Sequence, residues 1–421
     1  MSRIQIERNI TLLMIFGFFQ MFMIIIPVIV PLFQSKGLDL AQIFYLQAIF
    51  AGIVVCFEIP SGYFADRFGR RRAVTWGGFM TGVGYTVLTF ADDFSGLVLF
   101  ECSVGIGLSL TSGADIVLLY DSQKELDAEP EEQRNSIANF RMSKSMAETA
   151  AALVGGVVVL YSFNLLVLVQ AFISWLPFVV TLFLVEPSYH RLDEGGHLEN
   201  AKRVLSHIFV DDSFLRLLFI TMIAYSLSTF YVVWLMQPWW EGQGIPLSYF
   251  GVLWAGLNLM VGVSAKVSVK MERHLGAGLT LTTMAALPAI GYFSMALMDG
   301  WVVILLSAGF YLSRGINQVV LTDAFNARIP SEFRATANSL TGFAFRLVFI
   351  VTGPMIGYLT SWQGLSTTLM VLGIATAALY GLLMLPLIKR IPSHSIQQTG
   401  RAAIGRATNG RTTNGRGEGN P

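Results

Sequence analysis

Ionisable side chains stand inside long apolar runs of this sequence, and five of them are candidates for a functional role. They are Glu58, Glu101, Asp115, Arg314 and Arg346. An ionisable residue in a membrane-spanning segment is costly and usually faces a cavity or an opposite charge. We expect Asp115, Arg314 and Arg346 to serve ion coupling or to bind substrate charge, with Glu58 and Glu101 in a second rank. The alternative for Arg314 and Arg346 is a structural salt bridge.

A dense charge cluster lies between two other apolar runs. Residues 62–72 read Gly-Tyr-Phe-Ala-Asp-Arg-Phe-Gly-Arg-Arg-Arg. Gly62 is expected to permit close helix contact and Gly69 to form a tight turn, because glycine lacks a Cβ atom. For the three consecutive arginines, the alternative is that they only fix the orientation of the chain in a membrane.

The composition indicates an integral membrane protein. Hydrophobic residues make up 54% and charged residues 13% of the 421 residues, whereas soluble domains are about a quarter charged. A helix of about 20 residues crosses the roughly 30 Å of hydrocarbon. Twelve apolar runs are long enough, and they predict an all-α protein with spans near 9–32, 41–64, 73–91, 96–119, 142–161, 164–185, 214–236, 248–268, 277–297, 301–321, 338–360 and 364–388.

The basic residues predict how these spans are oriented. Lys and Arg are enriched in cytoplasmic segments. With the N-terminus in the cytoplasm, 25 of the 28 fall on the inner side, Lys36 alone falls outside, and Arg314 and Arg346 lie within spans. Both termini are therefore expected in the cytoplasm.

Two short internal repeats predict a duplicated architecture. Residues 113–121 match residues 315–323 at an offset of 202, so that Asp115 aligns with Asn317, and residues 272–276 echo residues 66–69. The predicted units are an N-terminal six-helix bundle (1–185), a cytoplasmic linker (186–213), a C-terminal six-helix bundle (214–388) and a tail (389–421) of Gly, Arg and Asn that is expected to be disordered.

Several chemical signatures are missing from the sequence. It has no Gly-x-x-x-x-Gly-Lys-Ser/Thr phosphate loop and no Gly-x-Ser-x-Gly elbow, and its five histidines show no metal-ligand spacing. We expect no cofactor, no metal and no enzymatic activity. The formal charge of +1 gives no indication of nucleic-acid binding.

The charge cluster resembles the signature of the major facilitator superfamily, Gly-x-x-x-Asp-Arg-x-Gly-Arg-Arg. The matching residues are Gly62, Asp66, Arg67, Gly69, Arg70 and Arg71. The resemblance covers the spans from 9 to 388 and implies two pseudo-symmetric six-helix bundles. Residues 119–122 and 334–339 look like those of a bacterial efflux-like branch, which implies the bacterial inner membrane.

The resemblance also implies a role for the cluster. In the family this loop is a cytoplasmic latch that holds the two halves together while the outside is open. Asp66 would face the start of the eleventh helix near Ala337-Asn338, where unpaired amides favour a carboxylate.

In the family, helices 1, 4, 7 and 10 line a central cavity. Aromatic and amide side chains on these and neighbouring helices suit an amphipathic organic solute. The candidates are Gln20, Tyr231, Trp234, Asn258, Asn317 and Gln318. Trp239 and Trp240 are instead expected to anchor a helix at the membrane surface.

The sequence departs from proton-driven members of the family in two places. Its fourth helix has no basic residue, and residues 150–156 lack the Gly-Pro pair of drug–proton antiporters. The leading hypothesis is a monomeric secondary transporter, embedded in the lipid bilayer, that exports a small organic solute against protons. The alternatives are uptake of a nutrient, siderophore or anionic metabolite, and a sensor or scaffold that has lost transport.

Overall fold

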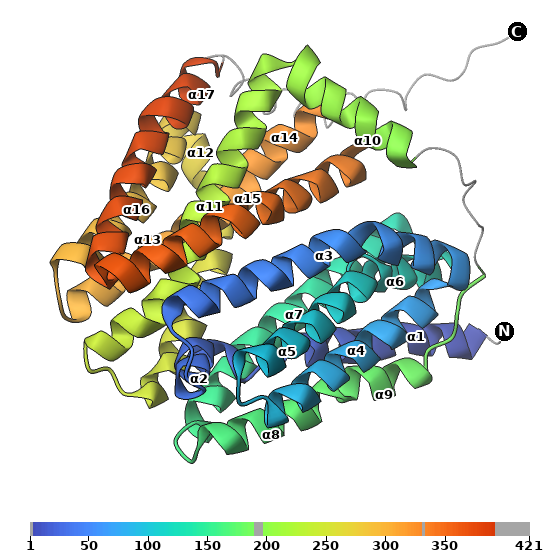
Figure 1. Cartoon of the computed structure of the whole chain (residues 1–421). Helices are drawn as coiled ribbons and strands as arrows, with labels where there is room; N and C mark the ends of the chain where they lie inside the picture. Colours follow the sequence, from blue (N-terminus) through green and yellow to red (C-terminus); the bar gives the residue numbers. More distant parts are fainter. Residues whose placement is uncertain (1–2, 189–196, 331–332, 392–421) are drawn as a thin grey trace, which may run out of the picture.

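The described part of the chain is built from helices (Figure 1). The computed structural model describes residues 3–188, 197–330 and 333–391. Its α-helices are α1 (Arg3–Met21), α2 (Ile29–Ser35), α3 (Leu40–Phe68), α4 (Arg70–Phe90), α5 (Phe94–Thr111), α6 (Ala114–Glu125), α7 (Pro130–Val158), α8 (Phe163–Ser174), α9 (Leu176–Leu182), α10 (His197–Ser206), α11 (Ser213–Gly242), α12 (Leu247–Leu297), α13 (Trp301–Ile316), α14 (Thr322–Arg328), α15 (Arg334–Gln363), α16 (Leu365–Leu379) and α17 (Leu385–Lys389). The short helical segments are η1 (Ile26–Val28), η2 (His207–Asp211), η3 (Asn317–Leu321) and η5 (Tyr380–Met384).

Nine helices within the described ranges are long and apolar enough to cross a membrane. One of them, α12, contains two helical stretches that meet at a kink at Gly276 (φ 80°). The predicted spans 73–91 and 142–161 correspond to α4 and α7, which are 21 and 29 residues long but are not among the nine. The count of twelve spans stays a prediction.

Side-chain caps begin several of these helices. Asp39 and Gln42 form a reciprocal capping box at the start of α3, and Asp93 accepts the Gly96 N–H at the start of α5. Asp212 accepts two N–H groups at the start of α11. These oxygens satisfy amides that have no partner within the helix.

The first predicted span is interrupted. Helix α1 ends at Met21, and η1 and α2 continue the span from Ile26. Two glutamines satisfy the backbone groups that the break releases. The Ile24 N–H donates to Oε1 of Gln170 (2.6 Å). Gln237 of α11 accepts the Val30 N–H and donates to the Ile26 carbonyl, both at 3.0 Å.

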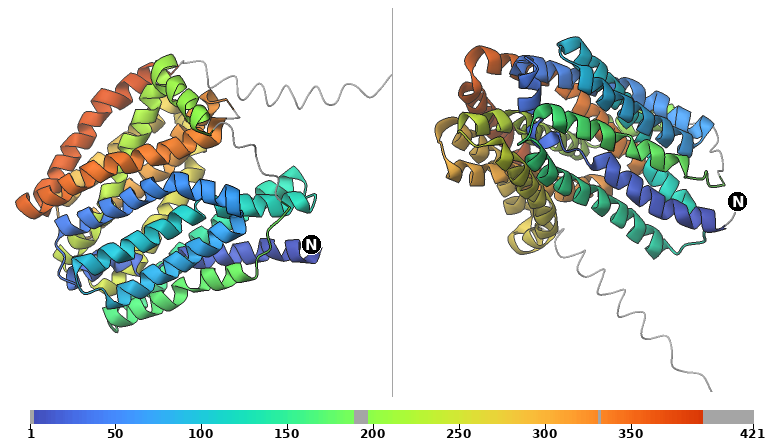
Figure 2. Two further views of the ribbon diagram at one scale, coloured as in Figure 1. Left: turned by 45° about the vertical axis from the view of Figure 1, so that its right-hand side comes forward. Right: turned by 90° about the horizontal axis from the view of Figure 1, so that it is seen from below.

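Two faces of the bundle can be named from the helix ends (Figures 1 and 2). The linker face holds residues 3–8, 66–72 and 197–211, and the far face holds residues 35–39, 91–93, 243–246 and 298–300. Figure 1 shows α3 and α15 close together toward the far face and further apart toward the linker face.

The N-terminal half (1–185) and the C-terminal half (214–388) pack closely through glycines on α7 and α12. A Cβ atom at Gly251 would lie 2.2 Å from the Ala152 carbonyl oxygen, and one at Gly156 would lie 3.0 Å from the Ser248 carbonyl oxygen. A side chain at Gly251 would therefore clash with backbone, and one at Gly156 would require the neighbouring backbone to shift by a small amount. Near the far face, the Ser361 hydroxyl accepts the Ala41 N–H (3.2 Å).

The duplicated pattern also occurs in the backbone. Gly37 and Gly244 both have positive φ, as do Gly69 and Gly276, and each pair is 207 residues apart. Gly69 (φ 99°) is the turn between α3 and α4, and Gly276 bends α12 at the matching point. Positive φ is accessible to glycine at little cost.

Two expectations were wrong. Trp239 and Trp240 are 5% and 0% exposed. The Trp239 indole donates to the Met295 carbonyl (2.9 Å), so this pair is core and does not anchor the helix at the membrane surface. Gly62 makes no close helix contact, because a Cβ atom there would meet no described atom within 4 Å.

Two predicted segments fall partly outside the described residues. They are residues 189–196 of the linker and residues 392–421 of the tail. The expectation of a disordered tail therefore stays a prediction.

Candidate functional site

A cavity of about 290 Å³ lies between helices of both halves. Helices α1, α3, α4 and α5 contribute from the N-terminal half, and α11 and α15 from the C-terminal half. Its lining is mostly aromatic and aliphatic, with a few polar groups. The lining residues are Gln20, Met21, Met23, Ile26, Ile29, Gln47, Phe50, Ala51, Thr81, Tyr85, Phe100, Glu101, Val104, Leu108, Phe230, Trp234, Phe345, Arg346 and Phe349.

Glu101 is the acidic residue of this lining. It lies on α5 and is 4% exposed. The Gln47 side chain of α3 donates from Nε2 to Oε1 of Glu101, at 2.7 Å. Among the described residues, no donor is found for Oε2 of Glu101. The Glu101 carboxylate also forms no ion pair with any of them.

Gln20 and Trp234 each bring a buried polar atom without a described partner to the same lining. Nε2 of Gln20 donates to Thr111 Oγ1 (2.9 Å). The Thr111 hydroxyl itself donates to backbone carbonyls of α5. Oε1 of Gln20 and Nε1 of Trp234 are the atoms without a described partner.

Arg346 reaches the cavity from α15 and pairs with a candidate from the other half. Its Nη1 lies 3.4 Å from Oε2 of Glu58 on α3. Both side chains are about a third exposed, at 27% and 32%. The structure thus brings together two of the four coupling candidates, which are 288 residues apart in sequence.

The other two coupling candidates lie outside this cavity. Asp115 begins α6 after Gly113 (φ 83°), and its Oδ2 lies 2.6 Å from Nζ of Lys144 on α7. Arg314 donates to the Thr229 carbonyl at 2.6 Å and lies over the Tyr311 ring. Asp115 therefore has an ion pair, whereas Arg314 has none within the described residues, so the structural salt bridge that was the alternative for Arg314 is not found.

Four of the six substrate candidates are not part of the cavity lining. The Tyr231 hydroxyl is hydrogen-bonded to Thr352 (2.6 Å), and Asn317 donates to Ser226 (3.0 Å). Asn258 is half-buried on α12, and Gln318 is exposed. Gln20 and Trp234 do line the cavity.

The charge cluster makes its described contacts within the N-terminal half. Arg70 pairs with Asp121 at the end of α6. The two carboxylate oxygens of Glu186 accept the Arg70 and Arg71 N–H groups, each at 2.8 Å, so Glu186 caps α4. Arg67 donates to the Tyr63 hydroxyl (2.6 Å).

Asp66 lies on the last turn of α3, because that helix continues to Phe68. Helix α15, the predicted partner of Asp66, begins at Arg334. The contact between the two stays a prediction. Sequence reasoning missed Glu186, whose place directly before Pro187 gave no sign that it would cap a helix more than 110 residues earlier.

Glu101 and Gln47 were also underrated from sequence. A lone Glu in the apolar run 96–119 signalled an intramembrane carboxylate, but nothing showed that it faced a cavity. Gln47 carried no signal, because its partner lies 54 residues away.

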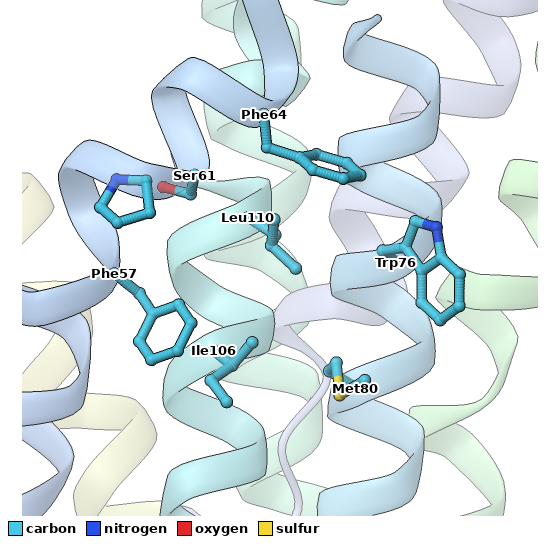
Figure 3. Close-up of a pocket in the computed structure, with 8 residues that line it drawn as sticks. Phe57, Ser61, Phe64, Trp76, Met80, Ile106 and Leu110 are labelled. Atoms are coloured by element: carbon cyan, nitrogen blue, oxygen red, sulfur yellow. The ribbon is translucent and has the colours of Figure 1, made fainter. Parts of the chain in front are cut away.

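A second cavity, of about 260 Å³, lies on the outside of the bundle between α3, α4 and α5 (Figure 3). Phe57, Ser61 and Phe64 of α3 face Trp76 and Met80 of α4 across it. Trp76 is 49% exposed. This groove is apolar and opens on the side of the bundle, so the cavity that contains Glu101 is the candidate site.

A helical membrane bundle with a cavity between its two halves defines the class of multi-pass membrane transporters. The chain belongs to the Major Facilitator Superfamily, whose family model matches residues 11–348. Members of this family are secondary transporters, and the fold class inferred from the motif is confirmed.

A curated relative and several solved structures agree. The uncharacterized MFS-type transporter YxaM of Bacillus subtilis (strain 168) is 22% identical over 363 residues, which cover 83% of this chain and 88% of the relative. A mutant of the nucleoside transporter NupG is 12% identical with a TM-score of 0.75, over 90% of this chain and 99% of that one. A bacterial homolog of the human lysosomal transporter Spinster, in an inward-facing and unoccupied conformation, is 16% identical with a TM-score of 0.73, over 94% of this chain and 100% of that one. At sequence identities this low, similarity to these structures establishes only the fold of this chain.

Proposed function

We propose that this transporter exports a small, amphipathic organic solute across the bacterial inner membrane in exchange for protons. The observation that carries the proposal is the cavity of about 290 Å³ between the two halves. Small-molecule sites are mostly apolar and have a few placed polar groups. Aromatic rings beside Gln20, Gln47 and Glu101 fit a solute with an apolar body and one polar end.

The arrangement of the two faces supports alternating access. Gln237 of the C-terminal half holds the broken first span of the N-terminal half, and Gly251 packs against α7. With the linker face in the cytoplasm, as the distribution of Lys and Arg predicts, these contacts close the outer side. The solute would enter from the cytoplasm and leave after these contacts separate.

The Glu58–Arg346 pair is our proposed coupling element. It joins α3 to α15, and therefore one half to the other. Protonation of Glu58 would remove the negative charge that Arg346 faces. The pair would then stabilise less strongly the conformation in which these two side chains are in contact. A proton that binds the two states unequally shifts their populations.

Cells that express the chain test the direction of transport. With fluorescent amphipathic solutes added outside, an exporter lowers the cell content relative to cells without the chain, and a proton uncoupler restores it. Net accumulation would instead support the uptake alternative. Absence of any flux in purified vesicles, together with a stable protein partner, would support the sensor or scaffold.

A further inference from the structure

The lining residues Glu101 and Gln20 carry three acceptor oxygens, and two of these have no described partner. One oxygen of Glu101 is held by Gln47 at 2.7 Å, and Oε2 accepts no hydrogen bond from the described residues. Oε1 of Gln20 is buried and has no described partner. In the assigned orientation Nε2 of Gln20 donates to the Thr111 hydroxyl, which itself bonds to backbone carbonyls, and Oε1 of Gln20 is the free acceptor.

The charges around the cavity leave an excess of one carboxylate. Its charged lining residues are Glu101 and Arg346, and Arg346 already faces Glu58 at 3.4 Å. Glu101 is 4% exposed. An ionised carboxylate in such a place is costly unless a cation accompanies it.

Aromatic rings complete the surroundings. Tyr85 and Phe100 meet edge to face with ring centroids 5.3 Å apart, and Phe230 and Trp234 line the same space from the other half. Ring faces attract cations, and the attraction grows when water is excluded. The Trp234 indole N–H adds one donor that is without a described partner.

We infer that the cavity binds an organic monocation, a protonated amine on an apolar or aromatic body, with Glu101 as its counter-ion and Gln20 as a second acceptor. The inference rests on the proposed function and names its substrate class. An N–H-bearing ammonium fits better than a quaternary ammonium, because the carboxylate and the amide oxygen both accept hydrogen bonds.

Binding of three probes of similar size to the purified full-length chain tests this inference. Protonated phenethylamine, neutral 2-phenylethanol and anionic 3-phenylpropionate are titrated calorimetrically into wild type and Glu101→Gln. A hydrogen bond to a charged group predicts that wild type prefers the amine by at least about tenfold. Glu101→Gln removes that preference and keeps the contact with Gln47, since the new amide oxygen still accepts from it.

Three further variants sharpen the result. Glu101→Asp should keep the preference for the amine in weakened form. Gln20→Leu should lower the affinity for the amine more than the affinity for its N-trimethyl derivative, which has no N–H to donate. Glu241→Gln, the same change at an exposed site at the end of α11, leaves all three affinities as in wild type.

Preference of wild type for the alcohol or the carboxylate, binding of none of the three, or an undiminished preference in Glu101→Gln would overturn the inference. Flux of neutral or anionic solutes without flux of amines would overturn it and leave the proposed transport standing. Absence of flux for every class would overturn the proposed function itself.

Discussion

Two of the candidate carboxylates inside this bundle face a basic side chain, and Glu101 does not. Asp115 faces Lys144 and Glu58 faces Arg346. A buried charge without such a partner is strongly disfavoured. Glu101 has a hydrogen bond from Gln47 but no described cation, which is why it is the residue at which a ligand charge is expected.

Replacing Glu58 by Gln should uncouple transport from protons. The amide cannot be protonated, and Arg346 loses its opposite charge in either state. We expect flux down a solute gradient to persist, whereas a pH gradient no longer drives accumulation in vesicles. A variant that responds to the pH gradient as steeply as wild type would contradict the coupling role.

Asp66→Asn should abolish transport while leaving membrane insertion intact. The loss of negative charge weakens the interaction expected with the amides that begin α15. Flux in vesicles and the amount of inserted protein are measured together. Full transport by this variant would refute the latch role.

Asp212 predicts an effect of pH on stability. Burial alone would raise the pKa of Asp212, but the N–H groups of Leu215 and Phe214 and the Arg328 guanidinium outweigh it and lower the pKa below 3.8. Because the pKa of Asp212 is lower in the folded state, its carboxylate stabilises the fold at a pH above the pKa of the unfolded state. This stabilisation is lost as the pH falls through the pKa of the folded state.

Asp212→Ala should therefore lower the free energy of unfolding at pH 7 by about 1 kcal/mol, a typical value for an N-cap. The difference from wild type should shrink as the pH falls below 3.8. Thermal unfolding in detergent measures both effects, with the neighbouring Asp211→Ala as control. A difference that does not depend on pH would show that the carboxylate charge contributes nothing.

Single residues were easier to predict from sequence than their partners. The apolar runs revealed Glu58, Glu101 and Asp115, because hydrophobic neighbours make a charge conspicuous. The partners come from distant positions, such as 29 residues away for Asp115 and 288 for Glu58. No periodicity within one helix reports such a contact.

At the scale of elements, we expect the contact between α7 and α12 to help hold the far face closed. Gly251→Ala would place a Cβ atom 2.2 Å from the Ala152 carbonyl oxygen. Overpacking costs typically about 1–3 kcal/mol, which is about 5-fold to about 150-fold in the population of the closed form. We expect the far face to open and transport to fall by a similar factor.

Spin-label distances across the far face measure that opening. Labels at Phe90 and Trp301, which are 79% and 63% exposed, replace these side chains in a background without Cys56 and Cys102. Gly251→Ala should lengthen the distance. Gly256→Ala on the same helix should not, because a Cβ atom there meets nothing within 4 Å. Equal distances in both variants would contradict a gate at this contact.

Most element positions followed from apolar length, and the failures have physical causes. Helix α7 begins at Pro130, 12 residues before the predicted span, because a helix satisfies its own backbone in water as well as in lipid. The break in the first span went unpredicted because Gln170 and Gln237 satisfy it from other helices. The Trp239–Trp240 pair was misplaced because sequence does not distinguish a buried aromatic residue from one at the membrane surface.

For the whole molecule, the matching glycines in the two halves support the proposed duplication. Gly37 pairs with Gly244 and Gly69 with Gly276 at one spacing, although the sequence around Gly276 retains little of the charge cluster. The first copy keeps Asp66 and its arginines. The family could be inferred from that cluster, whereas the cavity depends on helices that the sequence could not place relative to one another.

The most direct test of the account is solute flux in proteoliposomes under an imposed pH gradient. With the linker face outward and an acidic lumen, the account predicts that an aromatic amine enters and accumulates faster than it does by passive weak-base trapping in protein-free vesicles. Collapsing the pH gradient should stop this entry, and Glu101→Gln should prevent it. Entry that ignores the pH gradient, or accumulation only when the gradient is reversed, would contradict proton-coupled export.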